Sequence, residues 1–193
     1  MTKSKFAFES TAMRLFDTGK VYLWTFTFPD VCSVEEASYR WSELCGWFSW
    51  CYRGAVVGIR VYEMHQTHGM HVHALIIGRL DVNMVRVAAK RYGFGRINVK
   101  AADKGTAKYL AKYLGKSKRH IALRGRRLWS VFGRLDSKTR VSDVAVGSAI
   151  SECFKFARLS GIRQFAELSA AAYRMYNEML AGRMKSEFIE MLC

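Results

Sequence analysis

The segment GMHVHALIIG carries two histidines, His71 and His73, inside an otherwise apolar run. Successive side chains of a β-strand point to opposite faces, so these two imidazoles share one face of a strand. The preceding segment AVVGIRVYEM predicts a second strand, and the short stretch HQTHG joins the two into a hairpin. Two pairings fit this loop: one sets Glu63 opposite His73 and His65 opposite His71, and the other is shifted by two residues. In both pairings Glu63 shares the face of the histidines.

This face carries a candidate metal site. Two neutral imidazoles and one carboxylate form a three-ligand set for a divalent cation, with positions left open for substrate oxygens. His65 lies on the same face and is a candidate for an additional ligand. A His-apolar-His triplet is by itself more often a partly exposed surface feature than a metal site. The carboxylate of Glu63 in the neighbouring strand is what favours the metal interpretation.

A second set of chemically capable residues lies in the segment KYLAKYLGK. Tyr109 and Tyr113 are four residues apart, so they are neighbours on one face of a helix, and Lys112 and Lys116 follow them at three positions each. A phenol has a pKa of about 10, and nearby ammonium groups favour its ionised form and attract phosphate. The alternative is a structural helix with half-buried tyrosines and solvated lysines. The repeated YxxK in a strongly basic chain favours the chemical role.

The composition indicates a polyanionic partner. The chain has 193 residues, with 31 Lys and Arg against 16 Asp and Glu, which gives a formal net charge of +15. Nucleic acid and an anionic membrane surface both suit such a charge. The longest uncharged stretches are much shorter than the roughly 20 residues of a membrane-spanning helix. The five cysteines form no CxxC pair, and the first residues have no apolar signal-peptide core. We expect a cytoplasmic protein with no membrane partner.

The order of predicted elements is strand, helix, strand, strand, helix, strand, followed by the tyrosine helix and a further strand in RRLWSVFGR. This order predicts an α+β fold with a ferredoxin-like (RRM-like) antiparallel sheet, helices on one face and the other face free for a ligand. Ser33 and Asp81 are the predicted N-caps of the first two helices. We assign residues 1–140 to this domain and residues 141–193 to a helical C-terminal extension that packs on it or, second, mediates dimerisation.

Basic residues cluster around the tyrosine helix and predict a nucleic-acid-binding surface. Aromatic residues that could stack on bases, Tyr92, Phe94 and Trp129, are interleaved with them. For any one of these residues a solvated charge or a core aromatic is the commoner explanation, and only the clustering supports a binding role. The candidate phosphate-binding residues are Arg91, Arg96, Lys108, Lys118, Arg119, Arg124, Arg126 and Arg127.

These motifs together resemble those of the HUH endonucleases, the rolling-circle replication initiators of small single-stranded DNA phages, viruses and plasmids. HVH is followed about 35 residues later by the YLAKYLGK helix, and the WTFTFPD strand resembles the first motif of the family. Glu63, eight positions before His71, matches the acidic third ligand of viral members. The paired tyrosines resemble the two-tyrosine class of phage initiators. The resemblance covers roughly residues 20–120.

The resemblance implies a function. One tyrosine attacks a phosphate of single-stranded origin DNA, leaving a 5′-phosphotyrosine link and a free 3′-hydroxyl, and the second tyrosine cuts after one round of synthesis. A host polymerase extends the 3′-hydroxyl. GKS at 115–117 lacks the earlier glycine of a phosphate-binding loop, so a host helicase is also implied. Carried onto this chain, Tyr109 (acting first) and Tyr113 are the nucleophiles, Lys112 and Lys116 contact phosphate, and Glu63, His71 and His73 hold Mg²⁺ or Mn²⁺.

Two alternatives remain open at this point. A non-catalytic RRM-like module would explain the charge and the aromatic strands. It would not explain the repeated YxxK, and FGRINVK lacks the aromatic run of that fold. The other alternative is an HUH transposase or relaxase. Single-tyrosine transposases lack the tyrosine doublet, and the three-histidine cluster of relaxases is supported here only by His65.

Overall fold

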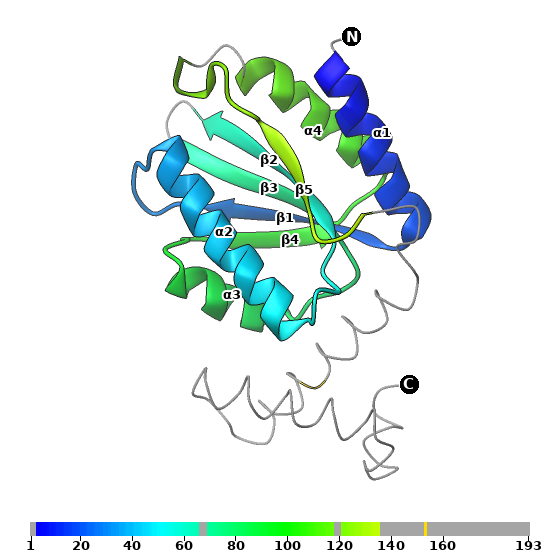
Figure 1. Cartoon of the computed structure of the whole chain (residues 1–193), viewed down its shortest axis with the longest axis vertical. Helices are drawn as coiled ribbons and strands as arrows, with labels where there is room; N and C mark the ends of the chain where they lie inside the picture. The colour runs from blue at the N-terminus through cyan, green and yellow to red at the C-terminus, as the bar shows by residue number, and fades with distance from the viewer. Residues whose placement is uncertain (1–2, 66–68, 118–120, 136–152, 154–193) are drawn as a thin grey trace.

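The computed structural model describes residues 3–65, 69–117, 121–135 and Cys153. The described residues form four α-helices, one short 3-10 helix and five strands (Figure 1). In chain order they are α1 (Lys3–Thr18), β1 (Val21–Thr27), α2 (Val34–Cys51), β2 (Gly58–His65), β3 (Gly69–Ile77), α3 (Val82–Arg91), β4 (Ile97–Ala101), α4 (Lys104–Ser117), η1 (Ile121–Leu123) and β5 (Trp129–Phe132). The predicted C-terminal extension, 141–193, lies outside the described residues except for Cys153, and its separation from residues 1–140 stays a prediction.

The strands form one antiparallel sheet in the order β4-β1-β3-β2-β5. Its first four strands, together with α2 and α3, have the ferredoxin-like arrangement, so the predicted α+β fold is confirmed. The predicted further strand is β5, which pairs with β2 at the edge of the sheet. The predicted caps are also present: the Ser33 hydroxyl accepts a hydrogen bond from the Glu36 amide, and Asp81 accepts bonds from the first amides of α3.

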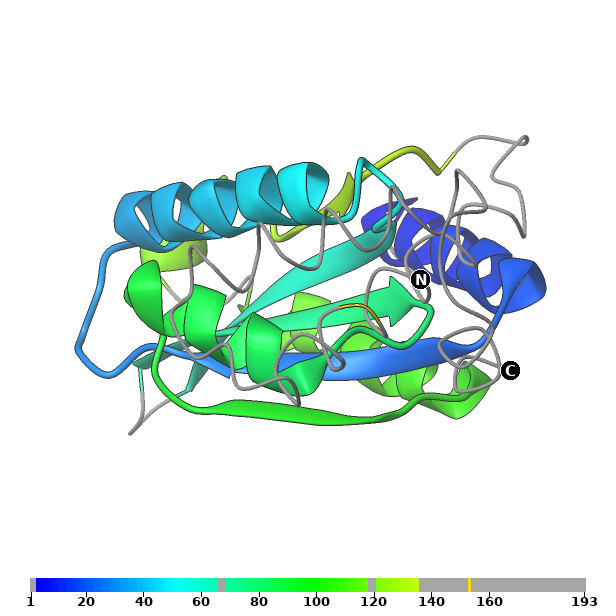
Figure 2. The same cartoon turned by 90° about the horizontal axis from the view of Figure 1, so that it is seen from below.

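The expectation of helices on one face only is wrong, because helices cover parts of both faces. Trp41 of α2 packs edge-on against Phe26 of β1 at 5.5 Å between ring centroids. On the opposite face, Phe8 of α1 packs against Trp129 of β5 at 5.7 Å, and α4 lies against β2. Figure 2 shows α2 above the strands and α4 below them. The face with the histidines is therefore partly roofed by α1 and α4.

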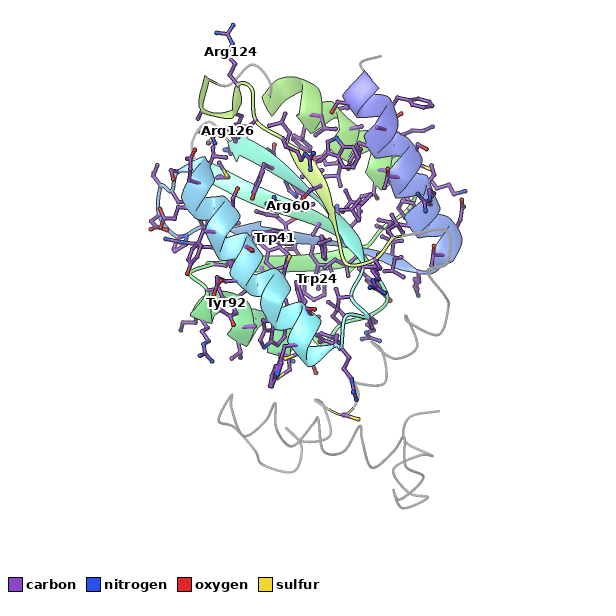
Figure 3. The ribbon with its side chains drawn as sticks, in the orientation of Figure 1. Trp24, Trp41, Arg60, Tyr92, Arg124 and Arg126 are labelled. Atoms are coloured by element: carbon purple, nitrogen blue, oxygen red, sulfur yellow. The ribbon has the colours of Figure 1, made fainter. Side chains whose placement is uncertain are left out.

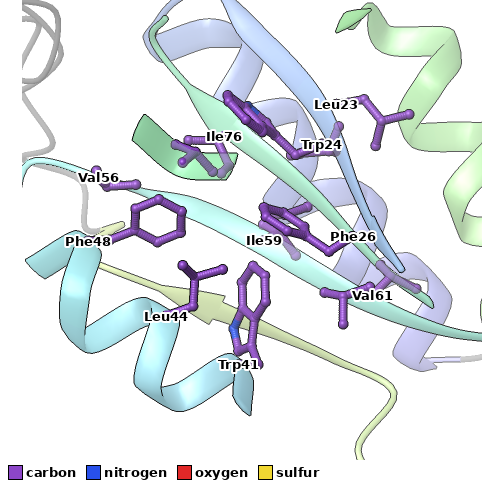
Figure 4. Close-up of a cluster of buried hydrophobic side chains, with 14 of the residues drawn as sticks. Leu23, Trp24, Phe26, Trp41, Leu44, Phe48, Val56, Ile59, Val61 and Ile76 are labelled. Carbon is purple, nitrogen blue, oxygen red and sulfur yellow. The ribbon is translucent and has the colours of Figure 1, made fainter. Parts of the chain in front are cut away.

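A mainly aromatic core joins α2 to the sheet. Trp41, Leu44 and Phe48 recur on one side of α2 and are buried against the Trp24 and Phe26 side of β1 (Figure 4). Apolar residues at this helical spacing form a continuous stripe, which buries one side of the helix and leaves the other to solvent. The sheet is thereby held rigidly, which fixes the positions of the polar side chains on its second face.

Candidate active site and nucleic-acid interface

The predicted metal-ligating residues lie together on the second face of the sheet. In the register of the hairpin, Glu63 is opposite His71, and His65 is opposite Gly69. This is the pairing shifted by two residues; the pairing of Glu63 with His73 is wrong. The ligand atoms of Glu63, His71 and His73 all lie within 4.8 Å of one another, and no other group of this kind occurs among the described residues.

This donor set fits a divalent cation. Ligands on opposite sides of Mg²⁺ are about 4 Å apart, so small side-chain rotations bring all three donor atoms into range. Two imidazoles with one carboxylate suit Mn²⁺ as well. The ring of His65 is stacked on that of His71, with 5.9 Å between centroids, and His65 is exposed at the end of β2. His65 therefore borders the cluster without being one of its three members.

The imidazole of His73 is held on both sides. Its Nε2 shares a hydrogen bond of 2.7 Å with Glu63 Oε2, and its Nδ1 shares one of 3.1 Å with Thr25 Oγ1. Thr25 lies directly opposite His73 on β1. With the Nδ1 proton donated to the threonine hydroxyl, the Nε2 lone pair is available to a cation. Thr25 was missed from the sequence, although its place two residues after Leu23 on a strand puts it on this face.

Helix α4 carries both tyrosines onto the cluster. Leu110 and Leu114 are buried, as predicted, and dock the helix on the rest of the domain. The ring of Tyr113 stacks on that of His73, with 5.6 Å between centroids and 17° between planes. Tyr109 meets Tyr113 edge-on at 5.0 Å, and their hydroxyl groups are hydrogen-bonded. The structure thus brings together the two sets of residues that the sequence identified separately.

The two phenols differ in their surroundings. Tyr109 is 48% exposed, whereas Tyr113 is partly buried between Tyr109 and His73. Burial raises the pKa of Tyr113 well above its ordinary value, and the hydrogen bond from Tyr109 and the negative charge of Glu63 raise it further. A positive charge beside Glu63 would act in the opposite direction.

Several predicted basic residues border this site. Lys108 and Lys112 are exposed on α4, and Arg96 lines a cavity of about 650 Å³ that also contains His71. Arg126 and Arg127 line a second cavity, of about 710 Å³, at the sheet edge formed by β5. Both cavities therefore combine cationic side chains with strands that carry the cluster or pair with them.

Other predicted contacts are not brought to the cluster. Arg91 ends α3, on the face of the sheet opposite the histidines, and Arg124 points outward into solvent (Figure 3). Arg126 is also ion-paired with Glu35 at the start of α2. A stacking role for Phe94 is wrong, because this ring is 3% exposed and belongs to the core. Lys118 and Arg119 lie outside the described residues, as does the side chain of Lys116.

The fold and the site define a class of protein: a ferredoxin-like sheet with a carboxylate–imidazole cluster beneath a tyrosine-bearing helix. Residues 21–118 match the family model of the ORF2-type replication-associated proteins, and the chain belongs to this family. The matched segment begins at β1 and ends just after α4, so it contains the whole cluster and both tyrosines. No curated protein and no solved structure matches the chain significantly.

Membership of this family makes the chain a replication-associated protein, and the polyanion implied by its net charge of +15 is accordingly DNA. None of the described helices is both long and apolar enough to cross a lipid bilayer.

Proposed function

We propose that the chain is a metal-dependent endonuclease of the HUH class and of the two-tyrosine type, which nicks and rejoins single-stranded DNA to initiate rolling-circle replication. The observation that carries this proposal is the stacking of Tyr113 on His73, because it puts a potential nucleophile beside a potential cation site. An RRM-like module needs neither the Glu63–His73 pair nor the phenol pair above it.

The reaction is a transesterification. A tyrosine oxygen attacks phosphorus, the bond from phosphorus to the 3′-oxygen breaks, and the 3′-oxygen takes up a proton. The 5′-phosphate stays on the tyrosine. Mg²⁺ or Mn²⁺ held by Glu63, His71 and His73 would neutralise phosphate charge. Because the phosphoester energy is kept in the protein–DNA bond, the reverse reaction rejoins the strand without an added energy source.

The chain's own residues divide the remaining tasks. Tyr109 acts first, because it is the more exposed phenol and a DNA strand reaches it before Tyr113. Tyr113, in hydrogen-bond contact with it, makes the second cut. Lys112 and Lys116 bind phosphate next to the tyrosines. A host helicase and a host polymerase supply unwinding and extension, in the cytoplasm of a host cell if the gene is carried by a phage.

The test is the covalent intermediate itself. The protein is mixed with end-labelled single-stranded oligonucleotides of random sequence and Mn²⁺, and the products are separated under denaturing conditions. We expect a labelled adduct that survives detergent and disappears when the cation is chelated. A module that only binds nucleic acid would retain DNA in a salt-sensitive way and give no adduct.

A further inference from the structure

The cavity next to His71 has a composition that the nicking reaction alone does not explain. Its volume is about 650 Å³, and it lies between the β1–α2 loop, the start of β3 and the residue before β4. Its walls mix apolar, acidic and basic side chains, namely Phe28, Val31, Asp30 and Arg96, together with Thr27 and His71. Since Thr27 and His71 are cross-strand neighbours, the cavity directly adjoins the metal-ligating cluster.

The walls of this cavity are fixed before any ligand binds. Arg40 donates hydrogen bonds to both carboxylate oxygens of Asp30, at 3.2 and 3.3 Å, and to the carbonyl of Gly93 at 2.7 Å. On the other wall, the amide and the hydroxyl of Thr27 both donate to the Arg96 carbonyl, at 3.1 and 3.0 Å. A cavity held in this way loses little conformational freedom when a ligand enters.

The side chains match a nucleobase better than a phosphate. Val31 is 93% exposed, so it contributes no buried surface to the core and is available to pack on a flat ring. The side chain of Asp30 is 56% exposed, and its hydrogen bonds to Arg40 lower its pKa, which keeps it ionised. A carboxylate repels phosphate but accepts hydrogen bonds from the amino group of a base, and its two oxygens have more acceptor sites than Arg40 uses. The exposed Arg96 can bind the phosphate attached to that base.

We infer that this cavity holds the base adjacent to the attacked phosphate and selects bases with an exocyclic amino group, so that adenine, cytosine and guanine are accepted and thymine is disfavoured. The inference rests on the proposed function, because it takes the phosphate at Glu63, His71 and His73 as its reference point. Asp30 is the residue that discriminates between bases, and Val31 provides affinity without discrimination.

The experiment is to sequence the DNA of the covalent adducts. Adducts are formed from the random library with Mn²⁺, and base frequencies are counted at each position relative to the linked nucleotide. We expect wild-type protein to deplete thymine at one position beside the linkage. Asp30→Asn, which replaces one acceptor oxygen with a donor, is expected to weaken that depletion about fivefold or more at this position alone. Val31→Ser is expected to lower adduct yield without changing the base frequencies.

Glu43→Gln is the matched control, since Glu43 is an exposed carboxylate on α2 that does not line the cavity. Its base frequencies should equal those of the wild type. The inference is overturned if wild-type adducts show no thymine depletion beside the linkage, or if Asp30→Asn leaves the depletion intact. Thermal melting of each variant separates a local effect from loss of the fold.

Absence of any wild-type adduct would instead contradict the proposed function. The cavity is then tested without chemistry, by fluorescence anisotropy with short oligo-dA and oligo-dT. A preference for oligo-dA that Asp30→Asn reduces would retain the base-binding cavity in a non-catalytic protein. Equal binding of the two oligonucleotides would overturn the cavity as well.

Discussion

The ring of Tyr113 lies nearly parallel to the ring of His73, with 17° between their planes. This contact joins α4 to β3, two elements that are separated in the chain by α3 and β4. It depends on the burial of Leu110 and Leu114 and on the packing of α1 beside α4. The chemistry of the site therefore depends on tertiary packing, and its parts can be tested one at a time.

The first prediction concerns the nucleophiles. Replacing both Tyr109 and Tyr113 with Phe removes the attacking oxygens while keeping the ring packing. We expect no covalent adduct and unchanged binding of single-stranded DNA, measured by anisotropy. Each single variant should retain adduct formation through the remaining phenol. Tyr39→Phe, an exposed tyrosine on α2, is the control and should behave as the wild type. An adduct formed by the double variant would place the nucleophile elsewhere.

The second prediction concerns the ligands of the cation. His71→Ala, His73→Ala and Glu63→Gln should each weaken Mn²⁺ binding by at least about tenfold, because each removes one of three donors. Titration calorimetry measures this directly. His65→Ala removes a neighbouring imidazole outside the cluster and should change the affinity much less. Equal effects of all four substitutions would argue against the three-ligand site.

Thr25 provides a third test, because it touches His73 without reaching the cation position. Thr25→Val keeps the shape of the side chain and removes the hydrogen bond to Nδ1, so the imidazole is less firmly oriented. We expect Mn²⁺ affinity to fall about tenfold, the lower end of the range for such supporting bonds. Thr25→Ser, which restores a hydroxyl, should recover most of the affinity. A purely structural role would give no recovery that follows the hydroxyl.

The fourth prediction concerns protonation of Tyr113. Its pKa is raised by burial first, then by Tyr109 and by the charge of Glu63, so at a given pH it is more fully protonated than a free tyrosine. Glu63→Gln removes the negative charge and should move the titration of Tyr113 to lower pH, though burial keeps it above about 10. NMR of isotope-labelled tyrosine, assigned with Tyr113→Phe, measures the shift. A titration moving to higher pH would contradict this arrangement.

Docking of α4 is the subject of the fifth prediction. Leu110 is fully buried, so Leu110→Ala should lower the free energy of unfolding by about 2–5 kcal/mol. Adduct yield should fall with it, since the tyrosines lose their fixed position. Val87→Ala changes a half-exposed residue on α3 and should alter stability by less than about 1 kcal/mol. Denaturant unfolding of both variants provides the comparison.

Much of this arrangement could be predicted from local sequence. The β-branched and aromatic strands, the Ser33 and Asp81 caps and the spacing of the tyrosines are signals that short segments carry by themselves. The hairpin register could be narrowed only to two pairings, because a shift of two residues keeps the same side chains on the same face. The face was therefore predictable from the sequence, and the partner of Glu63 was not.

The features that were missed depend on contacts between distant segments. Helix α1 carries Phe8, Ala12 and Leu15 at helical spacing, yet what they pack against is decided by α4 and β5. The burial of Phe94 follows from its contacts with Phe26 and Phe28, which the basic residues around it in the chain do not indicate. The role of Thr25 likewise appears only when β1 is aligned with β3.

The hydroxyl contact between Tyr109 and Tyr113 has a consequence for the order of events. Two oxygens that share one hydrogen bond resist carrying two negative charges at once, so loss of a proton from either makes loss from the other harder. Only one of them is then reactive at any moment. Such a pair would behave as a two-position switch, with one oxygen esterified or ionised while its neighbour stays in reserve for the next cut.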